Sequence, residues 1–218
     1  MEYLKSKKVQ TIILIVVSSI IILVILYGAF FHNRTKRCIK NINLKFKKIL
    51  HIQSLSRNKK IMKGNYKLSD FYIASSNKSY LTCTNYYDYI STDALKNCLE
   101  NGCRFIDLDI YNSDLTKESW PVVAYGKERG NWKYTNSLCF EECCKVISNL
   151  AFSNLILNNS DPLFINLNLY LNKNLYTVDK VAENIYKYFS FRMLPPQFSY
   201  QGISHNHQTT VNISETPI

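Results

Sequence analysis

The sequence has few histidines, and none lies in its central part. The four are His32, His51, His205 and His207. Imidazole is the side chain that most readily takes up and releases a proton near neutral pH. Any site built from the long region between His51 and His205 therefore lacks the usual group for acid–base catalysis.

Acidic residues are missing from a long stretch as well. The 218-residue chain has a net charge of +11, yet residues 32–69 contain 12 Lys and Arg residues and no Asp or Glu. From residue 70 to the end, 15 acidic residues outnumber 12 basic ones. The basic character therefore belongs to a linker, and the mildly acidic remainder is not typical of a nucleic-acid-binding domain. We expect no nucleic-acid partner.

The cysteines lack the spacing of a metal site. Their number, seven, is odd, and no two of them form a Cys-x-x-Cys pair. Buried, reduced thiols are the ordinary interpretation of such a set, and they agree with a cytosolic domain. The seven are Cys38, Cys83, Cys98, Cys103, Cys139, Cys143 and Cys144.

One long apolar run, TIILIVVSSIIILVILYGAFF, covers residues 11–31 and contains no charge. It is long enough to cross the ~30 Å hydrocarbon layer as a helix. A cleaved signal peptide is the alternative, but its apolar region is only ~7–15 residues long and ends at a small-x-small site. Gly28-Ala29-Phe30 is a poor match to such a site. We predict an N-terminal tail over 1–10 and a single transmembrane helix over 11–31.

Basic residues on the two sides of this span predict its orientation. Three lysines precede it, and seven Lys and Arg residues lie within the 17 residues that follow it. The positive-inside rule then places the C-terminal domain in the cytoplasm. The polybasic juxtamembrane linker over 32–65 either lies on anionic lipid, gaining about 1 kcal/mol per basic residue near the surface, or forms a solvated spacer. The two interpretations are compatible.

Beyond the linker, the pattern over 66–194 is that of a folded α/β domain. Strands are predicted over 71–75, 103–111, 120–126 and 161–171, and helices over 91–101, 136–152 and 177–191. The expected helix caps are Ser91 or Thr92, then Asn136 or Ser137, and then Thr177. Strands that alternate with helices predict a mainly parallel sheet. The remaining residues, 195–218, are polar and predicted to be disordered.

Four segments in this order resemble the X-box half of phosphatidylinositol-specific phospholipase C. They are YIASSNKSYLT, ALKNCLENGCRFIDLDIY, PVVAYGK and PLFINLNLY, within residues 68–191. The most specific piece is Gly102-Cys103-Arg104 followed by a strand with Asp-Leu-Asp. The resemblance implies a TIM-type β/α barrel, which needs about eight strands. The chain supplies about half, so the expected fold is a partial barrel. Its open edge is either exposed or covered by a second copy or another chain.

The resemblance also assigns catalytic positions. The family's two catalytic histidines fall on Asn77 and Tyr125. An amide accepts no proton at a useful pH, and a phenol with a pKa near ~10 is a poor substitute for imidazole. We therefore expect no active catalytic residue, and we expect Lys78, Asn77, Tyr125 and Lys127 to contact any bound headgroup.

Calcium is the cofactor that the resemblance implies, and its ligands fall on Lys78, Asp107, Asp109 and Asn168. A lysine ammonium repels calcium and can balance the carboxylates by itself. We hypothesise an ion cluster of Lys78 with Asp107 and Asp109 in place of the metal, so that the degenerate site Asp107, Asp109 and Asn168 holds none. Without the resemblance, the same residues would be interpreted as a solvated strand end and a surface loop charge.

The leading interpretation is a single-pass membrane protein with an inactive phospholipase C-like domain. It would bind a membrane surface, anionic lipids or phosphoinositides, or have a structural role. The alternatives are an active phosphoric diester hydrolase with atypical site residues, and an unrelated membrane-anchored interaction protein. The abundance of Asn, Lys, Ile and Tyr is typical of AT-biased coding and would suit a large DNA virus or a protist, hence a virion or host membrane.

Overall fold

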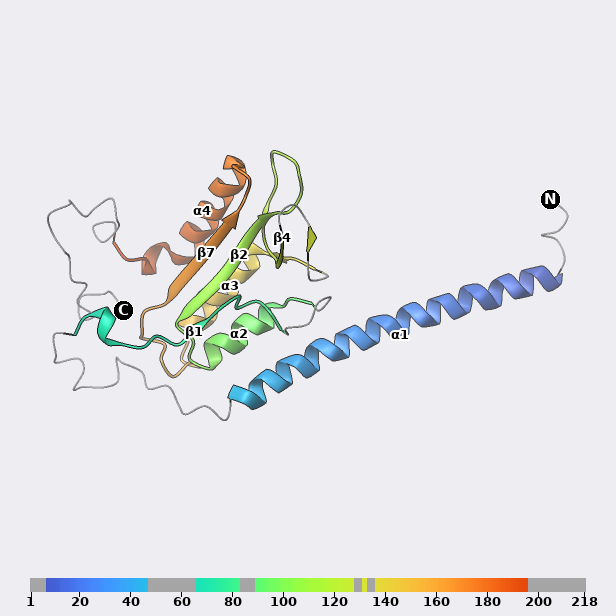
Figure 1. The fold of residues 1–218 in the computed structure, drawn as a ribbon, viewed down its shortest axis with the longest axis horizontal. Helices are drawn as coiled ribbons and strands as arrows, with labels where there is room; N and C mark the ends of the chain where they lie inside the picture. The colour runs from blue at the N-terminus through green and yellow to red at the C-terminus, as the bar shows by residue number, and fades with distance from the viewer. Residues whose placement is uncertain (1–6, 47–65, 83–88, 128–130, 133–135, 196–218) are drawn as a thin grey trace.

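The computed structural model describes residues 7–46, 66–82, 89–127, 131–132 and 136–195 (Figure 1). The helices are α1 (Lys7–Phe46), α2 (Thr92–Glu100), α3 (Phe140–Ala151) and α4 (Leu175–Phe189), with short 3-10 helices at Leu68–Asp70 and Ser190–Arg192. The strands are β1 (Ser75–Ser76), β2 (Phe105–Asn112), β3 (Pro121–Val123), β4 (Gly126–Lys127), β5 (Asn131–Trp132), β6 (Leu138–Cys139) and β7 (Phe164–Tyr170).

Strand β2 is the centre of a mixed five-stranded sheet. On one side it pairs in parallel with β7, from Phe105 opposite Phe164 to Tyr111 opposite Tyr170. On its other side, its first residues pair in parallel with β1 and its last residues pair antiparallel with β3. Strand β6 continues the sheet beyond β3, again antiparallel. Strands β4 and β5 form a separate two-stranded pair.

The predicted mainly parallel sheet is therefore only partly correct. Strands β1, β2 and β7 are parallel, but β3 and β6 run the other way. Only residues 113–120 connect β2 to β3. A parallel connection needs a crossover of a dozen or more residues, whereas a short connection returns the chain antiparallel.

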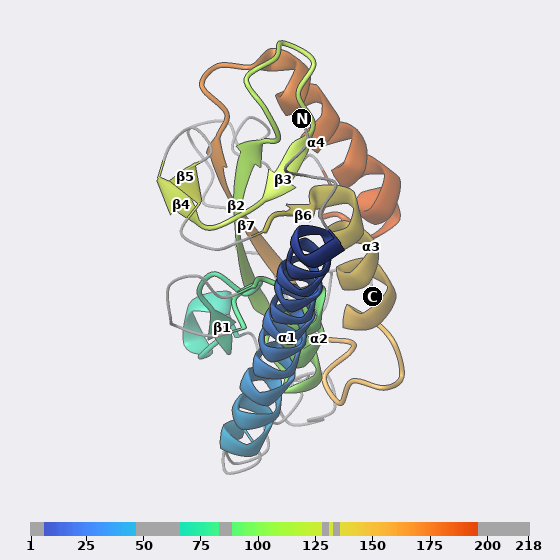
Figure 2. The ribbon, with the colours of Figure 1, turned by 90° about the vertical axis from the view of Figure 1, so that its right-hand side faces the viewer.

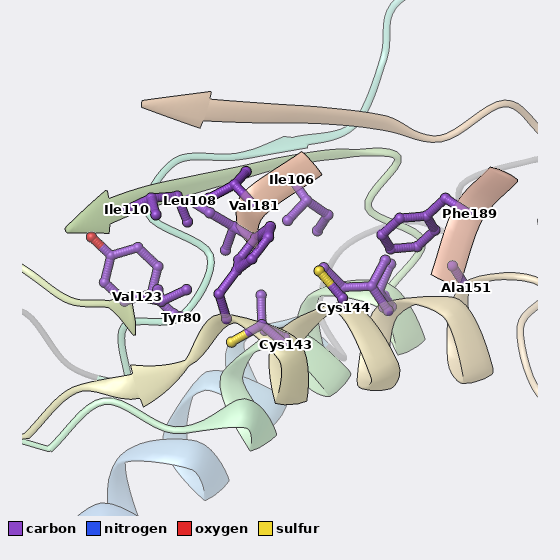
Figure 3. Close-up of a cluster of buried hydrophobic side chains, with 14 of the residues drawn as sticks. Tyr80, Ile106, Leu108, Ile110, Val123, Cys143, Cys144, Ala151, Val181 and Phe189 are labelled. Carbon is purple, nitrogen blue, oxygen red and sulfur yellow. The ribbon is translucent and has the colours of Figure 1, made fainter. Parts of the chain in front are cut away.

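The hydrophobic core lies between β2 and the helices (Figure 3). Alternation along the strand puts Ile106, Leu108 and Ile110 on one face, and each is fully buried. They join buried side chains from α3 and α4, and Figure 2 shows both helices on the same side of the sheet. These partners are Phe140, Cys143, Cys144, Ile147, Ala151, Val181 and Phe189.

One predicted helix start is correct and two are wrong. Ser91 caps α2, where its side chain accepts a hydrogen bond from the backbone N–H of Asp93. Helix α3 begins only at Phe140, because Asn136 instead bonds both backbone groups of Ile90, at 2.8 and 2.9 Å. Helix α4 begins at Leu175, before the predicted cap, because the side chain of Asn174 caps it.

Helix α1 extends well beyond the predicted span at both ends (Figure 1). By length and composition it qualifies as a membrane span, and its apolar window is not buried against the rest of the protein. Its continuation to Phe46 makes the first part of the predicted linker helical. The rest of that linker and the predicted tail beyond Pro195 lie outside the described residues.

The described cysteines are mostly free thiols. Burial raises the pKa of the Cys143 and Cys144 thiols, that of Cys144 to about 12. Both therefore stay protonated at neutral pH, as expected of core cysteines. Cys38 departs from the expectation of reduced thiols, because it is disulfide-bonded.

Candidate functional site

The face of β2 and β7 that points away from the helices carries a ladder of facing side chains. Side chains two residues apart lie on the same face of a strand, so the two strands contribute in register. Aromatic pairs close the ladder at both ends, with ring centroids 6.4 and 4.8 Å apart, and polar pairs fill its middle. In order, the pairs are Phe105–Phe164, Asp107–Asn166, Asp109–Asn168 and Tyr111–Tyr170.

Asp107 lies in the first polar step of this ladder, and both its carboxylate oxygens accept hydrogen bonds. Oδ1 accepts from the side-chain amides of Asn166 and Asn168, at 2.6 and 3.0 Å. Oδ2 accepts from the backbone N–H of Lys78 at 3.1 Å. The hydroxyl of Ser79 accepts from the backbone N–H of Asp107, and the backbone N–H of Ser79 donates to the carbonyl of Asp107 at 3.0 Å, so several hydrogen bonds hold the loop after β1 against β2.

Asp109 is more deeply enclosed, with only 1% of its surface exposed. Its Oδ2 accepts from the ammonium of Lys78 at 2.7 Å and from the hydroxyl of Tyr80 at 2.8 Å. Its Oδ1 accepts from the side-chain amide of Asn168 at 2.8 Å. A carboxylate this buried needs such a set of donors, because an unpaired buried charge is strongly unfavourable.

Lys78 is held in place by its backbone and by its side chain. Its φ of 49° lies in the left-handed region, which costs a non-glycine residue on the order of 1 kcal/mol or more. The hydrogen bond to Asp107 and the ion pair to Asp109 offset that cost. The ammonium also lies 4.5 Å from the ring centroid of Tyr125, so the cation contacts an aromatic face as well.

The phenols around Asp109 are kept neutral. Burial, with the nearby carboxylate of Asp109, raises the pKa of Tyr80 far above its ordinary value. The same two causes raise the pKa of Tyr111 to about 12. Tyr80 therefore acts as a fixed hydrogen-bond donor, and neither phenol can serve as a base near neutral pH.

Most of the residues predicted for the site are brought together. Lys78, Tyr125, Asp107, Asp109 and Asn168 form one connected cluster. Asn77 is exposed beside it, and the side chain of Lys127 lies outside the described part of the structure.

Two members of the cluster were missed by sequence reasoning. Asn166 could have been found from its alternation with Asn168 on one strand. Tyr80 offered no local signal, because its contact with Asp109 joins residues 29 apart in the sequence.

The sequence matches the family model for the phosphatidylinositol-specific phospholipase C, X domain, over residues 64–210. The chain belongs to this family. The match spans the whole ladder, the loop that carries Lys78 and the strand before Tyr125, so the X domain is the part of the chain that contains the cluster. The resemblance stated from the sequence is thereby confirmed at the level of the family.

Curated relatives and solved structures agree with this assignment. Over 88 residues, or 40% of the chain, the X domain is 33% identical to 1-phosphatidylinositol 4,5-bisphosphate phosphodiesterase gamma-2 of Rattus norvegicus, and equally to that of Homo sapiens. The chain spans only 6% of the length of these relatives.

Two solved structures resemble the fold. PLC21 of S. officinalis matches 65% of the chain with a TM-score of 0.50 and 20% identity, and PLC21 of L. pealei matches 66% with a TM-score of 0.51 and 21% identity. The match covers 16% of each of those chains. This likeness supports a partial TIM-barrel-like α/β fold built on a mixed sheet.

Calcium, the metal implied for the X domain, does not fit these residues. Calcium takes six to eight oxygen ligands at about 2.3–2.6 Å. Here all four carboxylate oxygens of Asp107 and Asp109 already accept hydrogen bonds. The Lys78 ammonium, 2.7 Å from Asp109, would repel a divalent cation. Within the described ranges, no group of three His, Cys, Asp or Glu side chains could hold a metal.

Adding millimolar calcium is therefore expected to leave the melting temperature of the full chain unchanged. A ligand that binds only the folded state stabilises it by an amount that grows with the logarithm of the ligand concentration above its Kd, so a true site would raise the melting temperature. Calorimetry in detergent, with magnesium as the control for ionic strength, measures the shift. An upward shift with calcium and not with magnesium would contradict the ion-cluster interpretation.

Proposed function

We propose that this chain is a membrane-anchored X domain that binds a lipid surface without cleaving its phosphodiester bonds. The observation that carries the proposal is the ion pair between Lys78 and Asp109 in the polar cluster. An ammonium takes the place that the family gives to calcium, while Asn77 and Tyr125 take the places of its histidines.

Cleavage through an inositol hydroxyl needs a base beside that hydroxyl and an acid beside the leaving oxygen. The cluster offers no available group for either role, because the carboxylates of Asp107 and Asp109 already accept hydrogen bonds on all four oxygens. Asn77 has an amide, the Lys78 ammonium is bound to a carboxylate, and the phenol of Tyr80 is buried with a raised pKa. Within the described residues there is a single histidine, His32, and it lies on α1 and not in the X domain.

The charge of the cluster favours a polyol over a phosphate. One ammonium faces two carboxylates, so the net charge is negative and a phosphate group gains little. The side-chain amides of the ladder are suited to the hydroxyls of an inositol ring, which both donate and accept hydrogen bonds. Asn166, exposed at one side of the ladder, is the most accessible of these groups.

Helix α1 would supply the membrane anchor. The excess of basic residues after the span favours a cytoplasmic X domain. The disulfide at Cys38 favours an oxidising compartment instead, because disulfides are rare in the cytosol. Protease protection of the chain in sealed membranes distinguishes the two orientations.

Strand β7 would be the place where another chain completes the barrel. Among the described strands it pairs only with β2, so its second edge has no strand beside it. Open edges are sites of further pairing. We propose that a second copy or another chain covers this edge.

The test uses the full chain in detergent with short-chain phosphatidylinositol, and with short-chain phosphatidylcholine as the control lipid. We expect phosphatidylinositol to raise the melting temperature and to release no inositol phosphate, with or without calcium. Asn166→Ala should reduce the shift, and Asn149→Ala, at an exposed position on α3, should not. Release of inositol phosphate would favour the active hydrolase. Neither a shift nor release would favour an interaction protein unrelated to lipid chemistry.

A further inference from the structure

Two loops lie side by side at the carboxyl ends of β2 and β7 (Figure 1). We call residues 113–120, together with residues 171–174 and the first two residues of α4, Leu175 and Tyr176, the two-loop tip. Three of its apolar side chains are unusually open to solvent: Leu115 is 87% exposed, Leu175 is 75% exposed and Trp120 is 54% exposed. Exposed apolar side chains that gather in one place commonly mark an interaction site.

Hydrogen bonds hold the two-loop tip in shape. The side-chain amide of Asn174 donates to the carbonyl of Thr116 at 3.2 Å, and the hydroxyl of Thr177 donates to the carbonyl of Ser119 at 2.8 Å. Within the first loop, Asp114 accepts from the backbone N–H of Thr116 at 2.8 Å. The two segments are therefore linked by hydrogen bonds, which fix the positions of the segments that carry Leu115 and Leu175.

Aromatic and basic side chains accompany the leucines. Trp120 and Tyr176 make an edge contact with ring centroids 6.5 Å apart, and the ammonium of Lys180 lies 5.5 Å from each ring. Lys117 and Lys173 are exposed on the two loops. Between the loops is an open hollow of about 570 Å³ whose wall includes both leucines and both lysines.

This arrangement matches the layers of a bilayer. Acyl chains accept leucine, whereas Trp, Tyr and Lys are enriched at the level of the headgroups. Four acidic side chains, those of Asp114, Glu118, Asp179 and Glu183, accompany the three lysines, and Glu183 pairs with Lys180 at 2.7 Å. The tip therefore has no excess of positive charge, and attraction to anionic lipid is not its main feature.

We propose that the two-loop tip is a membrane-insertion site that places Leu115 and Leu175 among the acyl chains and Trp120 among the headgroups. Its ligand is a lipid bilayer, and insertion depends on apolar contact. The site is separate from the polar cluster around Lys78, and it does not require that cluster to bind any headgroup.

Tryptophan fluorescence tests the proposal in the full chain. The chain has two tryptophans, so Trp132→Phe leaves Trp120 as the sole indole. This variant is reconstituted into neutral phosphatidylcholine vesicles whose acyl chains carry bromine near the headgroup, or into the same vesicles without bromine. Because bromine quenches an indole in contact with it, we expect emission about twofold lower in the brominated vesicles, as for a side chain inserted at the interface.

Matched leucine variants separate insertion from mere proximity to the vesicle. Leu115→Asp combined with Leu175→Asp should abolish the quenching. Leu155→Asp should preserve it, because Leu155 is 82% exposed but lies in the loop before β7, at the opposite end of that strand. Melting temperatures confirm that the variants fold. Absence of quenching in the parent, which would favour a protein partner, overturns the proposal. The proposal is also overturned if quenching persists in the Leu115→Asp, Leu175→Asp double variant, or if it disappears in Leu155→Asp.

Discussion

Replacing Lys78 by methionine is expected to lower the free energy of unfolding by about 3 kcal/mol, the low end of the range for breaking a buried ion pair from one side. The change leaves the carboxylate of Asp109, 1% exposed, without its cation. The low end applies because the Lys78 side chain is itself 30% exposed and because Tyr80 and Asn168 still donate to Asp109. Methionine keeps the length of the side chain, and it suffers the same backbone strain as lysine. Denaturant unfolding of the full chain in detergent measures the loss.

Lys96→Met is the matched control for this prediction. Lys96 pairs with Asp93 at 3.0 Å, but both side chains are about half exposed, at 46% and 54%. Exposed pairs of this kind contribute about 0.2–1 kcal/mol. If Lys78→Met costs no more than Lys96→Met, the cation at Lys78 does not hold the cluster together, and the account of the site is wrong.

Replacing Arg104 by methionine is expected to have an effect of similar size, about 3 kcal/mol, on the free energy of unfolding. Arg104 is only 4% exposed and donates hydrogen bonds to the carbonyls of Ala151, at the end of α3, and of Asn158. Burial lowers the pKa of its guanidinium. Methionine fills part of the space but removes this donor from both carbonyls. The carbonyl of Asn158 still accepts from the backbone N–H of Asp161 at 3.1 Å, so the larger loss falls on Ala151, and a buried acceptor that loses its donor costs about 1–3 kcal/mol.

Arg192→Met provides the comparison. Its guanidinium lies 4.3 Å from the ring centroid of Phe152, the ring that Arg104 also faces, but Arg192 is exposed. Loss of an exposed cation–π contact costs about 0.5–1 kcal/mol. Equal losses for the two variants in thermal unfolding would mean that the hydrogen bonds of Arg104 to the two carbonyls contribute little.

The parts of the fold that sequence predicted well are those set by local pattern. The predicted strand over 103–111 corresponds to β2 at Phe105–Asn112, because apolar residues alternate with aspartates along it and such alternation is a strong signal. Ser91 was recognised as a cap from its position before an amphipathic run. The family was recognisable because Gly102, Cys103 and Arg104 stand directly before that strand.

The parts that were missed depend on contacts between distant segments. Asn136 has the chemistry of a helix cap, but its amide is bound to the backbone of Ile90, 46 residues away. Tyr80 enters the site only because β1 lies beside β2. The direction of β3 could have been inferred from the short connection before it, since residues 113–120 leave no room for a crossover helix.

Under the proposed function, the ion pair at Asp109 would determine how the domain responds to calcium. A divalent ion enters and leaves a site as its concentration changes, whereas an ammonium attached to the backbone is always present at one per site. A domain in which Lys78 takes the place of the divalent ion would thus be insensitive to calcium transients. The fraction of the domain bound to lipid would depend on the composition of the membrane, and it would not change with a calcium stimulus.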